Sequence, residues 1–117
     1  MPYVVNVSTV FEDWFKNLEE DLQDSIAFSV GILEEHGHQL GRPHVDTLSG
    51  STLNNLKELR VQHAGEPYRI LFAFDPKREA LLLIGGNKAG NKRWYDEIIP
   101  KAEAIFEEHL AELDKES

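Results

Sequence analysis

The sequence of 117 residues contains no cysteine, so disulfide bonds and thiolate zinc sites are excluded. It also lacks a long apolar segment, since no apolar run exceeds the length of residues 80–84, which is far too short to cross a bilayer. The first residues lack the basic start and apolar stretch of a secretory signal. Together with a net charge of −9, these absences lead us to expect a cytoplasmic protein without a membrane partner.

Basic residues are concentrated in one part of this acidic chain. Residues 57–93 hold eight of the twelve lysines and arginines and only four acids, which gives this block a formal charge of +4. A basic surface on an acidic protein suits a polyanionic ligand. The alternative is that these are ordinary solvated charges. The positions of the individual residues have to distinguish a binding surface from ordinary surface charge.

The hydrophobic pattern predicts an α+β fold in a single domain, residues 1–117, with the element order β-α-α-β-β-β-α. Ser8 or Thr9 is expected to cap the first helix, and the second helix is expected to end near Gly37. Residues 38–55 show no periodicity and are expected to form an ordered loop. Strands are expected at residues 3–7, 56–62, 67–74 and 80–86, and the last helix over the apolar stripe between residues 98 and 113.

Alternation along the last two strands predicts a central, mainly antiparallel sheet with helices on one face. One face is apolar and should be covered by the helices; it carries Tyr68, Ile70, Phe72, Phe74, Ala80, Leu82 and Ile84. The other face carries Arg69 and is expected to stay open. If the first hairpin is symmetric about residues 64–65, Arg60 lies opposite Arg69. If the second hairpin is symmetric about Lys77, Gly85 also lies opposite Arg69.

Two arginines that face each other repel, so the pair formed by Arg60 and Arg69 needs a compensating group. One explanation is a bound phosphate, which accepts guanidinium groups through two parallel hydrogen bonds. The other explanation is an ion pair between Glu58 and either arginine, which would hold the edge of the sheet. The sequence leaves both explanations open.

The segment after the last strand, residues 85–95, combines glycines, cations and aromatic rings. Lys92 and Arg93 can contact phosphates, and Trp94 can stack on a base, which predicts RNA binding. The alternative for Trp94 is that it packs inward at the start of the last helix. The spacing of the glycines and the lysine is not that of a P-loop.

Three histidines, His36, His38 and His44, fall within nine residues. Three imidazoles could bind zinc, but neither a thiolate nor a histidine–carboxylate helix motif accompanies them. The pattern therefore predicts solvent-exposed loop histidines, and we expect neither a metal nor another cofactor.

The chain carries a series of motifs in a fixed order, namely Leu40-Gly41-Arg42-Pro43, Asn55-Leu56-Lys57-Glu58-Leu59-Arg60, Tyr68-Arg69, Phe72-Ala73-Phe74-Asp75-Pro76-Lys77-Arg78, Gly86-Asn87-Lys88-Ala89-Gly90 and Lys92-Arg93-Trp94-Tyr95. Together they resemble the RelE/HigB superfamily of toxins, and within it the phage-related Gp49-like group. The resemblance covers nearly the whole chain. It implies a small fold with a central antiparallel sheet, encoded beside an antitoxin.

The resemblance also implies an activity, which is cleavage of mRNA on the ribosome without a metal, through attack of a 2′-hydroxyl on the adjacent phosphate. By position, Arg60 and Arg69 match the family's strand arginines, and Lys57, Lys88 and Tyr95 match its other active-site positions. The implied partners are a cognate antitoxin, expected to be a helix-turn-helix protein, together with the ribosome and mRNA.

Two alternative functions stay open from the sequence. Relatives that poison gyrase share the fold but lack the active-site cations, so the protein could inhibit by binding alone. A decayed prophage protein would retain only antitoxin binding. The cations at the matched positions favour the nuclease. Four positions differ from the residues usual in the relatives and favour the decayed protein: Thr52, Leu53, Asn87 and Ala89.

Overall fold

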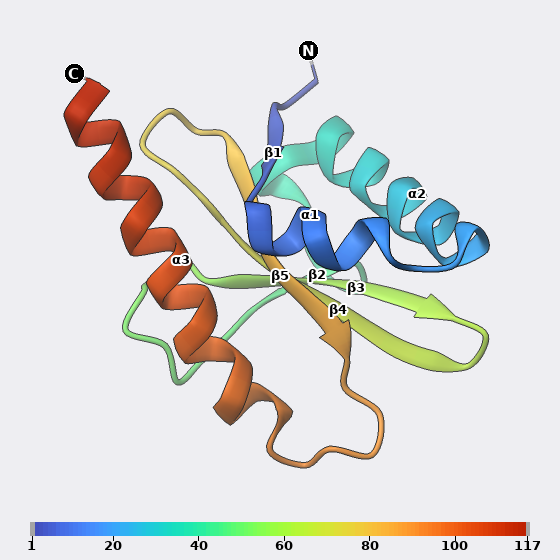
Figure 1. Cartoon of the computed structure of the whole chain (residues 1–117). Coiled ribbons are helices and arrows are strands. Elements are labelled where there is room, and N and C mark those ends of the chain that lie inside the picture. The colour runs from blue at the N-terminus through green and yellow to red at the C-terminus, as the bar shows by residue number, and fades with distance from the viewer. Residues whose placement is uncertain (1, 117) are drawn as a thin grey trace.

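Five strands form one sheet at the centre of the computed structural model, which describes residues 2–116 (Figure 1). The strands are β1 Val5–Val7, β2 Val45–Thr47, β3 Lys57–His63, β4 Glu66–Phe74 and β5 Ala80–Asn87. The helices are α1 Thr9–Lys16, α2 Glu20–His36, the short 3₁₀ helix η1 Gly37–Gln39 and α3 Trp94–Glu116. Across the sheet the order is β1-β5-β4-β3-β2, with β1 parallel to β5 and the other pairs antiparallel. The predicted α+β class and mainly antiparallel sheet are confirmed, while residues 1 and 117 of the predicted domain lie outside the described residues.

One strand falls inside the segment that the sequence predicts to be a loop. β2 has three residues, too few to show the alternation that marks a strand. Its Val45 is buried, and the backbone N–H of Arg60 donates to the carbonyl oxygen of His44 at 2.8 Å, which continues the pairing of β2 with β3. A strand this short forms because it pairs with β3 and not because of its own hydrophobic pattern, so it could not be predicted from the sequence.

The start of α1 is fixed as the sequence predicts. The Ser8 hydroxyl oxygen accepts a hydrogen bond from the backbone N–H of Phe11 at 3.0 Å and so caps the helix. The same hydroxyl donates to the carbonyl oxygen of Leu83 at 2.7 Å. Ser8 therefore both begins α1 and fastens it to β5. At the end of α2, Gly37 takes a φ of 57°, and a side chain there would collide with the ring of Tyr3.

Helices cover both faces of the sheet, so the prediction of helices on one face is wrong. The core under α1 and α2 includes Phe11, Ile26, Leu33, Leu59, Ile70, Phe72 and Leu82. The core under α3 includes Leu71, Ala73, Leu81, Leu83, Ile99, Ala102 and Phe106. Apart from Arg69, the second face of β4 and β5 is apolar, and burying it under α3 is favourable. Figure 1 shows α1 and α2 on one side of the strands and α3 on the other. None of the helices within residues 2–116 has the length and apolar composition needed to span a membrane.

A β-bulge in β5 changes the predicted register. Leu71 pairs with Ile84 while Phe72 pairs with Leu82, so Leu83 is an extra residue. Arg69 consequently lies opposite Gly86 and not opposite Gly85 as predicted. The bulge also moves Ile84 into the core under α3, opposite to its predicted face.

The residues after the bulge keep the shifted alternation. Gly85 now points toward α1, where a side chain would collide with the ring of Trp14. Gly86 points toward Trp94 on the side of Arg69, and its partner on β4 is Arg69 itself. Lys88, two residues further on, is thereby directed to the Arg69 side. The bulge thus brings the glycine–lysine segment to the face that carries the arginines.

A buried carboxylate joins the β4–β5 turn to α3. Asp75 Oδ1 accepts hydrogen bonds from the backbone N–H groups of Lys77 at 2.9 Å and Glu79 at 3.1 Å. Its Oδ2 lies 2.9 Å from His109 Nε2. Burial acts to raise the pKa of Asp75, but the bonds from His109 and from the two backbone N–H groups outweigh it, so the pKa is held below its ordinary value.

We expect the stability of the protein to fall in acid because of this group. A carboxyl whose pKa is lowered by folding stabilises the folded state above its unfolded pKa, about 3.9 for aspartate, and this contribution is lost as the pH falls through the lower folded-state pKa. Urea unfolding across that range measures the effect. The Asp75→Asn variant should be less stable near neutral pH and should lose less stability in acid. An unchanged pH dependence in this variant would contradict the assignment.

Candidate functional site

Arg60 on β3 and Arg69 on β4 lie directly opposite each other, as the symmetry of the hairpin predicts. Glu58 compensates them. Arg60 Nε donates to Glu58 Oε2 at 3.1 Å, and Arg69 Nε lies 3.6 Å from Glu58 Oε1. Glu58 shares the face of Arg60 because the two residues are two positions apart on one strand. With 2% of its surface exposed, Glu58 is a buried carboxylate placed between two guanidinium groups.

Tyr95 completes the group from the first turn of α3. Its hydroxyl donates to Glu58 Oε1 at 2.5 Å. Burial, followed by the hydrogen bond and the negative charge of Glu58, raises the pKa of Tyr95 to about 12. Tyr95 is therefore protonated near neutral pH, where it acts as a hydrogen-bond donor and not as a base. Lys88 Nζ lies 5.6 Å from the centre of the Tyr95 ring, within the range of a cation–π contact.

A second carboxylate holds Arg60 from the β2 side. Asp46 Oδ2 lies 3.3 Å from Arg60 Nη2 and 2.9 Å from Arg42 Nη2. The hydrogen bond from Arg42 is the main cause that lowers the pKa of Asp46. Sequence reasoning missed Asp46, because it falls in the segment expected to be a loop. It named Glu58 only as the alternative partner of the arginines, although the spacing of two residues already placed Glu58 beside Arg60.

The two arginines are held differently. The Arg60 side chain is 35% exposed and contacts two carboxylates, whereas the Arg69 side chain is 11% exposed. Arg69 Nη1 donates to the carbonyl oxygen of Tyr68 at 3.0 Å, but its buried Nε has no hydrogen-bond partner among the described residues. A buried donor without a hydrogen bond is costly, so Arg69 Nε, which makes only the 3.6 Å ion pair with Glu58, would be stabilised by an additional acceptor.

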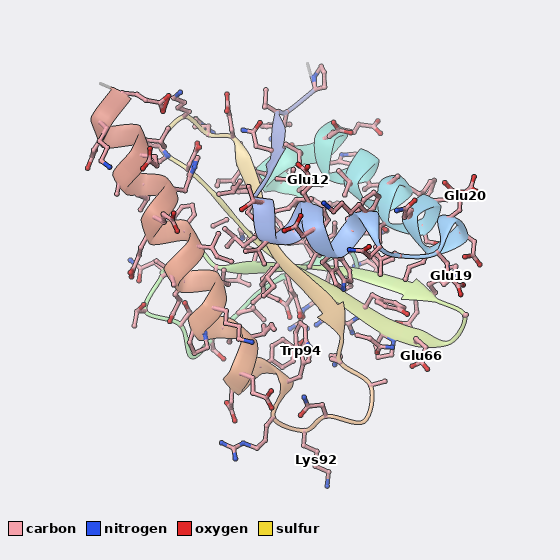
Figure 2. All side chains as sticks on the ribbon, in the orientation of Figure 1. Glu12, Glu19, Glu20, Glu66, Lys92 and Trp94 are labelled. Carbon is pink, nitrogen blue, oxygen red and sulfur yellow. The ribbon has the colours of Figure 1, made fainter. Side chains whose placement is uncertain are left out.

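Two of the predicted residues are not brought to this group. Lys57 lies on the opposite face of the sheet, because it is three positions from Arg60 on the same strand, so the structure does not bring it to this group. Trp94 is 6% exposed and packs in the core against Tyr95 and Gly86, so it is not available to stack on a base. The inward position given as the alternative for Trp94 is the one observed (Figure 2).

Lys92 and Arg93 lie in the exposed connection between β5 and α3. In Figure 2 the Lys92 side chain points away from the sheet into solvent. Within the described residues, neither side chain forms a hydrogen bond or ion pair with the group around Glu58. Both residues lie between Lys88 and Tyr95 in the sequence. As for metals, no cluster of three or more histidine, aspartate or glutamate side chains suited to an ion is found within residues 2–116.

Two of the four positions that are expected from the sequence to differ from the relatives have local structural roles. The backbone N–H and the hydroxyl of Thr52 donate to Glu103 Oε2 at 2.6 and 3.0 Å, which ties the preceding loop to α3. A hydrogen bond from Ser51 is the main cause that lowers the pKa of Glu103. Asn87 Oδ1 accepts from the backbone N–H of Ala89 at 2.9 Å and shapes the turn before Lys88.

Residues 13–107 match the model of the phage derived protein Gp49-like family. The chain belongs to this family. The Gp49-like chain is also 52% identical over 101 residues to HigB3 of Mycobacterium tuberculosis, a protein named as a toxin, and the match covers 86% of this chain and 87% of that protein. HigB2 of the same organism, also named as a toxin, is 46% identical over 103 residues. That match covers 86% of this chain and 51% of HigB2, so the chain spans about half of that protein.

Solved structures agree on the fold of the Gp49-like chain. A substituted variant of the E. coli toxin RelE in the free state superposes with a TM-score of 0.56 at 8% identity, covering 80% of this chain and 92% of RelE. The toxin–antitoxin complex RelBE2 of Mycobacterium tuberculosis gives a TM-score of 0.56 at 18% identity, covering 74% of this chain and 99% of that one. The fold is RelE-like, and the predicted membership of the RelE/HigB type of toxins is confirmed.

Proposed function

We propose that this toxin is a ribosome-dependent mRNA endonuclease that arrests translation, and that a cognate antitoxin, expected to be a helix-turn-helix protein, neutralises it in the cytoplasm. The observation that carries the proposal is the group of Arg60, Arg69, Lys88 and Tyr95 around Glu58. Three cations and a protonated hydroxyl lie around or next to one carboxylate, and such groups can stabilise charge and transfer protons in metal-free cleavage of RNA.

In the proposed reaction the 2′-hydroxyl oxygen attacks the adjacent phosphorus, the bond to the 5′-oxygen breaks, and the products carry a 2′,3′-cyclic phosphate and a 5′-hydroxyl. Arg60, Arg69 and Lys88 stabilise the charge on the phosphorane. Glu58 takes the proton of the 2′-hydroxyl once the entering phosphate has replaced it as the partner of the arginines, and the departing 5′-oxygen takes a proton from solvent water. Tyr95 stays protonated and donates a hydrogen bond to a phosphate oxygen, in line with its raised pKa.

Induced expression tests the proposal directly. We expect growth arrest within a few generations and new mRNA 5′ ends inside translated reading frames, detected by primer extension, which disappear when translation initiation is blocked. Growth arrest with intact transcripts and inhibited DNA supercoiling would replace the nuclease by the gyrase-poison alternative. Absence of arrest would leave only the decayed protein that binds an antitoxin.

RNA binding by the purified toxin should weaken steeply with salt. Each phosphate contact on a single strand contributes about 0.7 to the slope of log affinity against log salt concentration, so about four contacts give a slope near −3. Alanine at both Lys92 and Arg93 should reduce the slope to about −1.4, because two contacts are lost. Fluorescence anisotropy with a short oligoribonucleotide measures both values.

Lys16 and Lys115 provide matched controls for the salt experiment. Both are exposed lysines paired with a nearby acid, Asp13 and Glu112. Lys16 is on α1, and Lys115 is in the last turn of α3, at the end opposite to the β5–α3 connection. Their replacement by alanine should leave the slope unchanged. A slope near zero, or one that does not respond to Lys92 and Arg93, would mean that the basic block is ordinary solvated surface.

A further inference from the structure

The basic block of residues 57–93 is divided between the two faces of the sheet. Arg60, Arg69 and Lys88 gather near Glu58, but Lys57 and Arg78 line a separate pocket. This pocket has a volume of about 340 Å³ and is lined by His38, Asn55, Lys57, Phe74, Asp75 and Arg78. Lys57 and Arg60 are three positions apart on β3, which separates their Cα atoms by roughly 10 Å and directs their side chains to opposite faces.

The two cations of the pocket lack a charged partner. Lys57 Nζ donates to the Thr47 hydroxyl at 3.0 Å, and Arg78 Nη2 lies 3.3 Å from Nε2 of His38, which accepts only when neutral. Within residues 2–116 neither cation forms an ion pair. Most donor positions of the ammonium and guanidinium groups are therefore free to bind an anion.

The acids near the pocket are already engaged. Asp75 holds His109 with one oxygen and the backbone N–H groups of its own turn with the other. Glu79 accepts a hydrogen bond from the Asn6 amide at 3.0 Å. Asp75 lowers the positive potential of the pocket, yet both of its oxygens have other partners. Its structural effect is to fix the turn that presents Arg78.

The backbone at Arg78 is itself informative. Arg78 has a φ of 64°, in the left-handed region where a residue with a Cβ is disfavoured and glycine is not. The turn nevertheless carries an arginine whose side chain reaches into the pocket. A residue kept in a disfavoured conformation is a reason to look for a function of its side chain.

We propose that this pocket is a second anion site, which binds the phosphate group of a ribonucleotide. A lysine supplies a compact charge and an arginine supplies a planar fork, the combination that suits a phosphate. Asn55 adds an amide, and the Phe74 ring gives one wall an apolar surface against which a ribose can lie. The site lies on the face opposite Glu58 and does not depend on the proposed cleavage reaction.

Titration of the ¹⁵N-labelled protein by NMR tests the site, with inorganic phosphate, adenosine 5′-monophosphate and a short oligoribonucleotide as separate ligands. We expect saturable shifts at Asn55 and Arg78 with all three. Tighter binding of the mononucleotide would assign the site to a terminal phosphate, and tighter binding of the oligomer to the RNA backbone. Cleavage and toxicity are not measured, so failure of the proposed nuclease function leaves this result unaffected.

Arg78→Gly is the decisive variant, because glycine suits the positive φ and the fold should be retained. It should raise the dissociation constant for phosphate at least tenfold, as should Lys57→Gln. Ala64→Gly is the matched control. Ala64 has a φ of 51° in the turn between β3 and β4, which follows the end of β3 opposite to Lys57, and its replacement should leave phosphate binding unchanged. Undiminished binding by Arg78→Gly and Lys57→Gln, or shifts confined to Arg60 and Arg69, would overturn the proposal.

Discussion

Glu58→Ala should destabilise the protein by about 3 kcal/mol, the order of magnitude found when one partner of a buried ion pair is removed. The variant leaves Arg60 and Arg69 facing each other across β3 and β4 with no carboxylate between them. Like charges directly opposed on neighbouring strands repel. The Tyr95 hydroxyl, which is half-buried, also loses its acceptor, and this adds to the loss of stability.

Urea unfolding of a matched pair of variants separates this effect from ordinary loss of a surface charge. Asp46→Ala also removes a carboxylate from Arg60, but its ion pair with Arg42 is exposed and should cost less than about 1 kcal/mol. The loss of unfolding free energy in Glu58→Gln should lie between those of the two alanine variants, since the amide keeps an acceptor for Tyr95 but has no charge. If Glu58→Ala is no more destabilising than Asp46→Ala, Glu58 does not organise the site.

The strand pattern allowed the centre of this site to be predicted. The length of the first hairpin and the position of its turn determine that Arg60 faces Arg69, because an antiparallel register follows from the turn alone. The same alternation places Glu58 beside Arg60 and Lys57 on the opposite face. Resemblance to the family grouped Lys57 with the active-site residues, and its spacing of three residues from Arg60 was the signal that the strand places it on the other face.

The features that could not be predicted depend on tertiary packing. The apolar run at residues 80–84 gives no sign that Leu83 is the extra residue of a bulge. That bulge decides whether Gly85 or Gly86 faces Arg69, and it brings Lys88 to the arginine side. The sequence also does not show which face of the sheet the apolar stripe of α3 covers, because that depends on packing between segments far apart in the chain. Tyr95 reaches Glu58 only because α3 begins at Trp94, whose buried ring fixes the start of the helix.

The double variant Arg60→Ala, Arg69→Ala should abolish the growth arrest that expression of the native chain is expected to cause. Removing one preorganised charge donor from a transition state typically lowers the rate by about 10²–10³. The two losses should not simply add, because both arginines contact the same carboxylate. Colony counts after induction measure the arrest, and primer extension measures the cleavage that underlies it.

Loss of toxicity in the double variant is informative only if the fold survives, because Glu58 is then buried without a cation. Circular dichroism and thermal unfolding establish this, and the milder Arg69→Lys provides a second test. It retains the charge beside Glu58 but not the planar fork, so it should fold normally and still cleave more slowly. Arg42→Ala removes an exposed arginine that contacts Asp46 and not Glu58, and it should remain toxic. Full toxicity of a folded double variant would show that the arginines bind no phosphate in the transition state, and inhibition by binding would then become the better account of the toxin.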